Sequence, residues 1–132
     1  SIYALNVNYS FYPSETLEIR PRFGVRYGNY SGNVNSFMKY KVDLEARYRF
    51  GRIMLMPRIF YSFSNYDEEN PIFSETREDH GYGGHLMTNF FAPFGFQDWS
   101  AQLLLAYSKG DSNINFYDTE GITTGLFLTY MF

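Results

Sequence analysis

The sequence predicts an all-β protein, an antiparallel β-barrel that crosses a membrane, and three observations lead to this prediction. Apolar and polar residues alternate along most of the chain with the two-residue period of strands. The alternating segments are roughly 10–14 residues long, which exceeds most soluble strands and is enough for a tilted strand to cross a bilayer. Aromatic residues form 21% of the chain and gather at both ends of these segments, as they do at membrane interfaces.

Length and composition narrow the possible classes of protein. The 132 residues predict a single transmembrane β-barrel domain over residues 1–132. There are 0 cysteines, which excludes disulfides and thiolate chemistry, and the net charge of −3 does not favour binding to nucleic acid. Without a long apolar run, no transmembrane helix is expected. We expect no cofactor, no metal and no catalytic residues.

Seven strands are predicted, and the segment 37–50 alternates most clearly. Because proline has no N–H to donate, Pro21 and Pro57 predict interruptions in the backbone pairing. The predicted strands lie over about residues 2–12, 17–30, 37–50, 53–66, 81–91, 99–108 and 124–132.

The connections between these strands are predicted to alternate in length. Residues 13–16, 51–52 and 92–98 are short or compact, whereas residues 31–36, 67–79 and 109–119 are longer and polar. Bacterial outer-membrane barrels have short turns on the periplasmic side and long loops outside the cell. This places residues 67–79 outside the cell and the last strand running towards the periplasm.

The chain ends on "TGLFLTYMF", in which Leu128, Tyr130 and Phe132 fall on one face of the last predicted strand. In this ending the chain resembles the Gram-negative outer-membrane β-barrel superfamily, where a terminal Phe after alternating apolar residues is common. The segments "LEIRPRFGVRYG" and "MLMPRIFYSF" look like those of monomeric, oligosaccharide-channel porins. The resemblance implies a location in the outer membrane, contact with its lipid and lipopolysaccharide, and recognition of Phe132, Tyr130 and Leu128 by the barrel assembly machinery.

The odd number of strands does not fit a closed bacterial barrel, which has an even number. We therefore expect the sequence to be the C-terminal part of an eight-stranded or larger barrel, with one or more upstream strands missing. The alternative is a second chain that completes the wall. An open edge in hydrocarbon would leave backbone groups unpaired at several kcal/mol each.

The face predicted to point inward carries most of the basic residues, and this feature suggests a function. Only three acids share the face, namely Glu18, Asp43 and Glu45, so five of the eight bases are left without an opposite charge. Such a surplus favours a hydrated lumen that prefers anions. The structural alternative is an internal salt-bridge network in a narrow barrel. The eight bases are Arg20, Arg22, Arg26, Lys39, Lys41, Arg47, Arg49 and Arg58.

We therefore expect a non-enzymatic outer-membrane channel for passive diffusion of small anionic hydrophilic solutes. A plugged structural or adhesive barrel is the main alternative, because apolar residues such as Met54, Met87 and Phe127 are also predicted to point inward. An outer-membrane hydrolase or acyltransferase using His80 or His85 is a third possibility, although no catalytic motif surrounds either residue. A soluble barrel of the lipocalin or fatty-acid-binding kind is a further alternative for the fold, with its apolar residues inside. The strand lengths, the terminal Phe and the two groups of aromatic residues oppose it.

Overall fold

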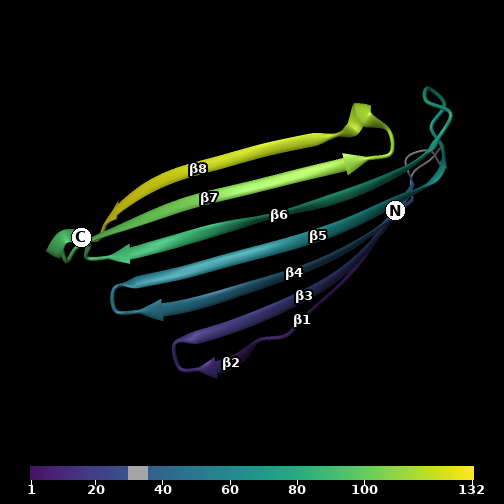
Figure 1. Ribbon diagram of the computed structural model, residues 1–132. Coiled ribbons are helices and arrows are strands. Elements are labelled where there is room, and N and C mark those ends of the chain that lie inside the picture. The colour runs from purple at the N-terminus through teal and green to yellow at the C-terminus, as the bar shows by residue number, and fades with distance from the viewer. Residues whose placement is uncertain (30–35) are drawn as a thin grey trace.

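The computed structural model describes residues 1–29 and 36–132, and they form one antiparallel sheet of eight strands. Figure 1 shows the strands side by side in a single layer. Two short 3-10 helices lie in connections, η2 (Pro93–Gly95) and η3 (Asn115–Tyr117). The strands are β1 (Ile2–Asn8), β2 (Phe11–Ser14), β3 (Leu17–Gly28), β4 (Phe37–Phe50), β5 (Ile53–Glu69), β6 (Thr76–Phe91), β7 (Trp99–Ser112) and β8 (Thr119–Tyr130).

The strand order follows the chain, so the antiparallel all-β class is confirmed. The order is β1-β3-β4-β5-β6-β7-β8, with β2 also paired to β3. In the described part of the chain, no pairing joins β1 to β8, so these strands are the edges of an open sheet. Every neighbouring pair is antiparallel, which means that β1 and β8 run in the same direction.

The prediction of seven strands is wrong, because the segment 2–12 contains a break between β1 and β2. The ladder of β1 with β3 ends at Asn8, which pairs with Arg22. The next position of β3 is Pro21, which has no N–H to donate to β1. Pairing resumes in the same register at Phe11, opposite Ile19, and the register shifts only between Phe11 and Ser14 within β2. The predicted interruption at Pro57 is also confirmed, because the β4–β5 ladder skips from Arg58 to Leu55.

Several strands extend further than polarity predicted. Residues 67–79 were expected to form a loop, but β5 continues to Glu69 and β6 begins at Thr76. Residues 109–112 likewise belong to β7. Antiparallel backbone hydrogen bonds do not depend on apolar side chains, so a polar segment can continue a ladder in water. In Figure 1 the β5–β6 hairpin projects beyond the other connections.

The two ends of the sheet are named here by their connections. At the turn end lie residues 15–16, 51–52 and 92–98, together with Phe132. At the hairpin end lie the β5–β6 hairpin and the connection that contains η3 (Figure 1). The connection 92–98 is no shorter than the turn 70–75, so the expected contrast between short and long connections is weaker than the sequence suggested.

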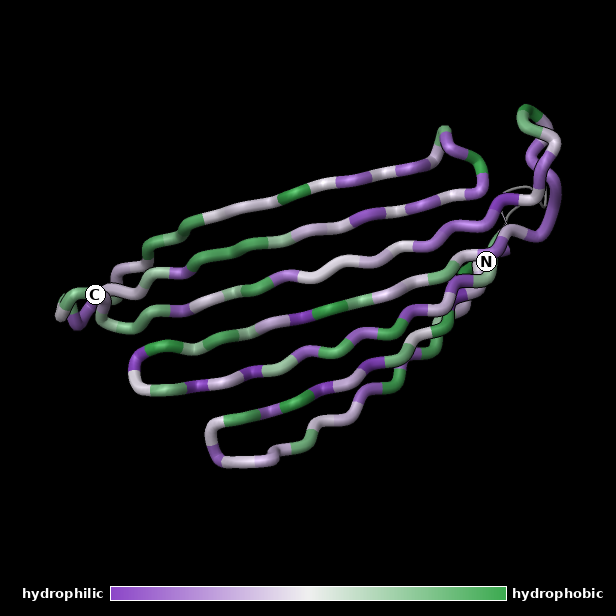
Figure 2. Tube along the Cα trace, in the orientation of Figure 1, coloured by the Kyte–Doolittle hydropathy of each residue, from purple (hydrophilic) through white to green (hydrophobic). Residues whose placement is uncertain are grey.

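Cross-strand register gives the sheet two faces of opposite character. The polar face carries Arg22, Asp43 and Phe60 in one row, and the apolar face carries Phe23, Val42 and Tyr61 in the adjacent row. In Figure 2 hydrophilic and hydrophobic residues alternate along the strands. Within the described ranges, only Ile114 is a buried hydrophobic residue. The apolar face is therefore uncovered, and none of the helices described is long and apolar enough to cross a membrane.

Candidate functional site

The candidate site is the row of charged residues on the polar face of β3, β4 and β5. The register places all eight predicted basic residues on this face, because side chains two positions apart share a face of a strand. Arg20 lies opposite Glu45, and Glu45 lies opposite Arg58. Whether this face lines a lumen stays a prediction.

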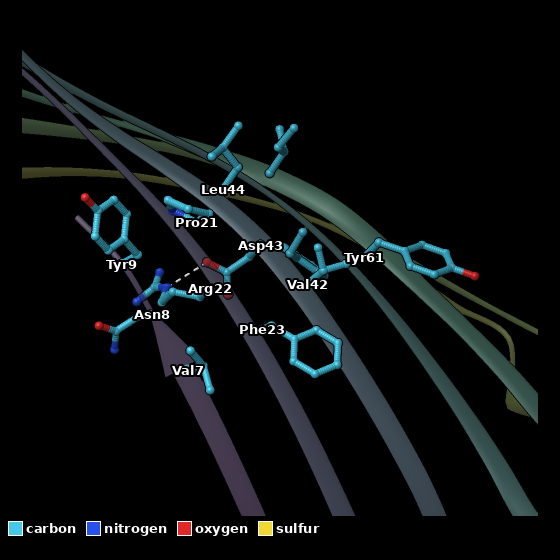
Figure 3. A pocket seen from close by; sticks show the side chains of 12 residues that line it. Val7, Asn8, Tyr9, Pro21, Arg22, Phe23, Val42, Asp43, Leu44 and Tyr61 are labelled. Atoms are coloured by element: carbon cyan, nitrogen blue, oxygen red, sulfur yellow. Dashed lines mark hydrogen bonds and ion pairs between the residues drawn. The ribbon is translucent and has the colours of Figure 1, made fainter. Parts of the chain in front are cut away.

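An ion-pair network occupies the middle of the polar face. Arg22 donates to Asp43 Oδ1 at 2.7 Å and to Glu45 Oε2 at 2.7 Å. Arg58 donates to the other carboxylate oxygen of Asp43 at 3.1 Å. The side chain of Asp43 is only 6% exposed, so two arginines neutralise a buried carboxylate. Figure 3 shows the contact between Arg22 and Asp43 across β3 and β4.

The third predicted acid is paired within its own strand. Glu18 accepts a hydrogen bond from Arg20 at 2.7 Å, and Arg20 also donates to the hydroxyl of Ser10 at 3.0 Å. The three predicted acids are therefore engaged, by Arg20, Arg22 and Arg58.

The other five basic residues have no carboxylate partner in the described part of the chain. Arg26, Lys39 and Lys41 lie towards the hairpin end, and Arg47 and Arg49 lie towards the turn end. Two of the five contact rings, Lys41 over Phe60 at 5.6 Å and Arg49 over Phe91 at 5.5 Å. The surplus of five cations is thus divided between the two ends, with a neutralised network between them.

The rest of the polar face changes character along the strands. Towards the turn end most of its residues are large and apolar, apart from the hydrogen-bonded pair Gln102 and Asn89. These apolar residues include Met54, Met56, Met87, Phe91, Leu104 and Phe127. Towards the hairpin end they are small or hydroxylated, including Ser62, Ser64, Gly81, Ser108, Gly110 and Gly121.

Neither the charge pattern nor the apolar alternation of the sequence indicates these small residues. A Cβ on Gly81 would lie 2.6 Å from Ser62 Oγ, and one on Gly110 would lie 2.7 Å from Thr119 Oγ1. Hydroxyl groups of neighbouring strands therefore lie over these glycines. The result is a thin polar lining around Gly81 and Gly110, which the bulkier Phe37, Tyr66 and Tyr117 border. The alternating glycines Gly81 and Gly83 of β6, the first of them opposite Ser62, are the signal that could have revealed it.

A cavity of about 320 Å³ lies on the polar face at the hairpin end. Its lining spans six strands, which shows that the face is concave here. Contributing residues are Arg26 of β3, Lys39 of β4, Ser64 of β5, Asp79 of β6, Gly110 of β7 and Thr119 of β8. A neighbouring cavity of about 420 Å³ shares Arg26 and Lys39 and adds Lys41.

An arginine held between aromatic rings forms the hairpin-end border of this cavity. Arg77 forms an ion pair with Asp79 at 2.6 Å, and its guanidinium carbon lies 3.5 Å from the centre of the Tyr117 ring. The same guanidinium carbon lies 4.7 Å from the centre of the Tyr66 ring. The amide of Asn70 donates to the Tyr117 hydroxyl at 3.2 Å and so ties the hairpin to η3. The sequence analysis did not identify this cluster.

The two histidines do not share a site. His80 lies on the apolar face, where its Nδ1 is 2.6 Å from the Tyr61 hydroxyl and its ring lies 5.0 Å from that of Phe63. His85 is on the polar face, opposite Arg58 and Ala106. Among the described residues, no group of three or more His, Cys, Asp or Glu side chains could hold a metal ion.

The predicted assembly residues lie at the turn end. Tyr130 packs between Trp99 and Phe132, with a ring-centre distance of 5.1 Å to each. Leu128 is opposite Ala101 on the apolar face and is exposed. Recognition of these residues by an assembly machinery stays a prediction.

Two acids on the apolar face at the hairpin end, Asp111 and Glu120, form local contacts. Asp111 lies 3.5 Å from Lys109, and Glu120 accepts a hydrogen bond from the Tyr107 hydroxyl at 3.0 Å. The apolar face therefore becomes polar at this end, beyond its aromatic residues.

Comparison with known proteins places the chain in a family without assigning an activity. No curated protein matches the sequence. One family model, described as protein of unknown function (DUF2860), matches residues 1–131. Because that match covers nearly the whole sequence, the chain belongs to the DUF2860 family.

Proposed function

We propose that the sheet is part of the wall of an antiparallel β-barrel in a Gram-negative outer membrane, and that the barrel is a channel for small anionic hydrophilic solutes. The single observation that carries the proposal is the contrast between the two faces. The concave polar face has five unneutralised cations, whereas the opposite face is apolar and uncovered. A membrane barrel with an aqueous interior requires this polarity.

Rows of aromatic residues on the apolar face support insertion in a bilayer. Towards the hairpin end Tyr40 lies opposite Phe63, and Tyr61 lies opposite Tyr82. Towards the turn end Trp99 lies opposite Tyr130. The rows between them are aliphatic, with the pairs Leu44–Ile59, Leu86–Leu105 and Leu103–Leu126. An aliphatic band between two aromatic girdles is the lipid-facing pattern of transmembrane barrels.

Closure of the proposed barrel needs strands in addition to those described. Because β1 and β8 run in the same direction, joining them directly would create a parallel seam in an antiparallel wall. Two copies with the same orientation in the membrane would also meet β8 to β1 in the parallel sense. Because β1 and β2 both pair with β3 at the same edge, the eight strands occupy seven positions across the sheet. An odd number of further strands, the outermost running opposite to both edges, therefore gives antiparallel seams and an even number of positions. A second chain or another segment of a longer protein could supply them.

The surplus charge gives a direct test of the channel. We expect the protein in planar lipid bilayers to pass current and to prefer anions, measured as a reversal potential in a salt gradient. Replacement of Lys39, Lys41 and Arg47 by Glu should shift this preference towards cations. These residues are chosen because Arg22 and Arg58 neutralise Asp43, so replacing those would disturb the network itself.

A control reverses the charge of two basic residues off the polar face, which is two thirds of the charge change of the triple replacement. Arg52 lies in the β4–β5 turn and Lys109 lies on the apolar face, so replacing both by Glu should leave the reversal potential nearly unchanged. An equal shift in the control would mean that overall charge, and not the polar face, sets the preference.

A plugged barrel without transport is the second candidate, and one observation favours it. The large apolar residues of the polar face gather at the turn end, where Met54, Met87 and Phe127 could fill a narrow bore. If the folded, membrane-inserted protein passes no current, the channel function is contradicted and the structural role of a plugged barrel remains.

Orientation is tested by labelling in intact cells. Cysteine replaces Ser74 at the tip of the β5–β6 hairpin or Arg52 at the β4–β5 turn, and an impermeant thiol reagent is added. The proposed orientation predicts labelling at residue 74 only. Labelling at residue 52 only would reverse the orientation, and labelling at both would contradict a transmembrane arrangement.

A further inference from the structure

The strongest unassigned feature is the group of three unpaired cations at the hairpin end of the polar face. Arg26 and Lys39 are direct cross-strand partners, and Lys41 lies two residues further along the same face of β4. Like charges placed directly opposite each other destabilise a sheet. No carboxylate of the described residues pairs with any of the three, so the sheet itself does not relieve this repulsion.

The acids near these cations are already neutralised by other residues. Asp79 and Asp111 both line the cavity of about 320 Å³. Asp79 accepts two contacts from Arg77, at 2.9 and 2.6 Å, and Asp111 lies 3.5 Å from Lys109. The positive charge of Arg26 and Lys39 in the cavity is therefore not cancelled locally.

The cavity also has the size and lining of a small-molecule site. Its volume falls at the lower end of the range for ligand pockets, roughly 300–1,000 Å³. Ser62, Ser64 and Thr119 place hydroxyl groups in the lining, and Gly81 and Gly110 add no side chain. Hydroxyl groups donate and accept hydrogen bonds, so they complement a hydroxylated ligand.

The border of the cavity is held in place by contacts between the β5–β6 hairpin and η3. Arg77 packs against Tyr66 of β5 and Tyr117 of η3, and Asn70 bonds to the Tyr117 hydroxyl. A site whose lining is ordered before binding loses less conformational entropy when a ligand arrives.

We propose that Arg26 and Lys39, assisted by Lys41, form a binding site for a small polyhydroxylated organic anion with two negative charges, such as a sugar phosphate. Two adjacent cations match the charge, and the serine and threonine hydroxyls match the hydroxyl groups. The inference deepens the proposed channel function and rests on it for the role of the site, which is to concentrate anionic solutes at one end of the polar face.

The test measures binding, without conductance, by titration calorimetry on the folded protein purified in detergent micelles at low salt. The probes are glucose 6-phosphate, inorganic phosphate and glucose. Glucose 6-phosphate should bind, phosphate should bind more weakly, and glucose should not bind. Equal affinity for phosphate and glucose 6-phosphate would overturn the hydroxylated class of ligand, and binding of glucose would overturn the role of charge.

Charge-neutral variants locate the site. Replacing Arg26 and Lys39 together by Gln should weaken the binding of glucose 6-phosphate by about tenfold or more, since two charge-assisted hydrogen bonds to the phosphate become neutral ones. The matched control replaces Arg47 and Arg49 by Gln, which removes the same charge from the turn end. Its affinity should stay within about twofold of the unchanged protein. An equal loss in the control would overturn a localised site.

Thermal unfolding keeps the proposal testable if the variants alter the fold. Without ligand, Arg26→Gln/Lys39→Gln should melt at the same or a higher temperature, because like-charge repulsion is removed. With glucose 6-phosphate, only the unchanged protein and the control variant should gain stability. A lower melting temperature in the ligand-free double variant would contradict the repulsion on which the site is argued.

The two proposals can fail separately. If glucose 6-phosphate binds but the protein passes no current, the channel function is contradicted and the binding site is supported. Current with anion preference but no binding of either anionic probe would leave the channel and overturn the site.

Discussion

Neighbouring residues of β4 have opposite environments, because their side chains lie on opposite faces of the sheet. Val42 and Leu44 are 49% and 43% exposed on the apolar face, whereas Asp43 between them is 7% exposed on the polar face. A soluble β-protein buries its apolar face and leaves its charges in water. Here the apolar side chains are uncovered and a carboxylate is buried between arginines. This contrast between the two faces is the observation on which the proposed membrane wall rests.

The largest expected effect comes from a charge on the apolar face. Leu44→Arg should destabilise the membrane-inserted protein by roughly 2–4 kcal/mol, because the residue lies in the aliphatic band that we place at mid-membrane. Folding into lipid vesicles measured over a urea series gives the free energy of unfolding. The control Ser108→Arg puts the same charge on the polar face and should cost much less. Equal costs at both positions would contradict the assignment of the faces to lipid and water.

The next effect comes from the polar face. Asp43→Ala removes the acid that Arg22 and Arg58 share. We expect a loss of about 2 kcal/mol, between the values for exposed and buried pairs, because the two arginines are partly exposed. The control Glu18→Ala breaks a single pair within β3 and should cost less. The same denaturation series measures both, and a neutral Asp43→Ala would show that the network does not stabilise the face.

Introducing a tryptophan on either face should affect conductance differently and should change stability less than the two charge variants. A Cβ at Gly121 on the polar face would have only Ser108 Oγ within 4 Å, at 3.8 Å, so a side chain can begin there without a clash. Gly121→Trp should lower single-channel conductance in planar bilayers. Thr124→Trp, on the apolar face of the same strand, should leave conductance unchanged. If both variants conduct like the unchanged protein, the polar face does not border the ion path.

The smallest effect on stability should come from the final residue. Phe132 is fully exposed, so its deletion removes little burial and should change the free energy of unfolding by less than about 0.5 kcal/mol. Its proposed role is as a signal, so the amount of protein assembled in the outer membrane of cells should fall clearly. The control Met131→Ala changes a neighbouring exposed side chain. Normal assembly without Phe132 would remove the role implied by the family resemblance.

The alternation of side chains was sufficient to predict which segments form the sheet and which side chains share a face, but not the number of strands. In the segment 37–50, each lysine, arginine or acid of the polar face is followed by an apolar or aromatic residue. Successive side chains of a strand point to opposite faces, so the pattern alone separates Asp43 from Val42 and Leu44. The interruptions at Pro21 and Pro57 were predictable for an equally local reason, the missing N–H.

Strand ends were not predictable from polarity. Polarity predicted a loop around Asp67, yet this segment belongs to β5, where the Asp67 N–H donates to the Ser36 carbonyl and pairing with β6 resumes at Glu69. Backbone hydrogen bonds do not require apolar side chains. The break that divides the segment 2–12 into β1 and β2 depends on which residue of β3 lies across from it, and that is a matter of register.

The sequence by itself determined that the chain alternates, that one face is apolar, and that eight bases share the other face with three acids. Only the tertiary structure decided which charges pair. Arg22 and Arg58 meet on Asp43 because the register of three strands aligns them, while Arg26 and Lys39 are aligned with each other. It also brought Arg77 onto Tyr117, which is forty residues away in the chain. Alternation is a property of neighbours along one strand, whereas charge pairing is a property of neighbours across strands.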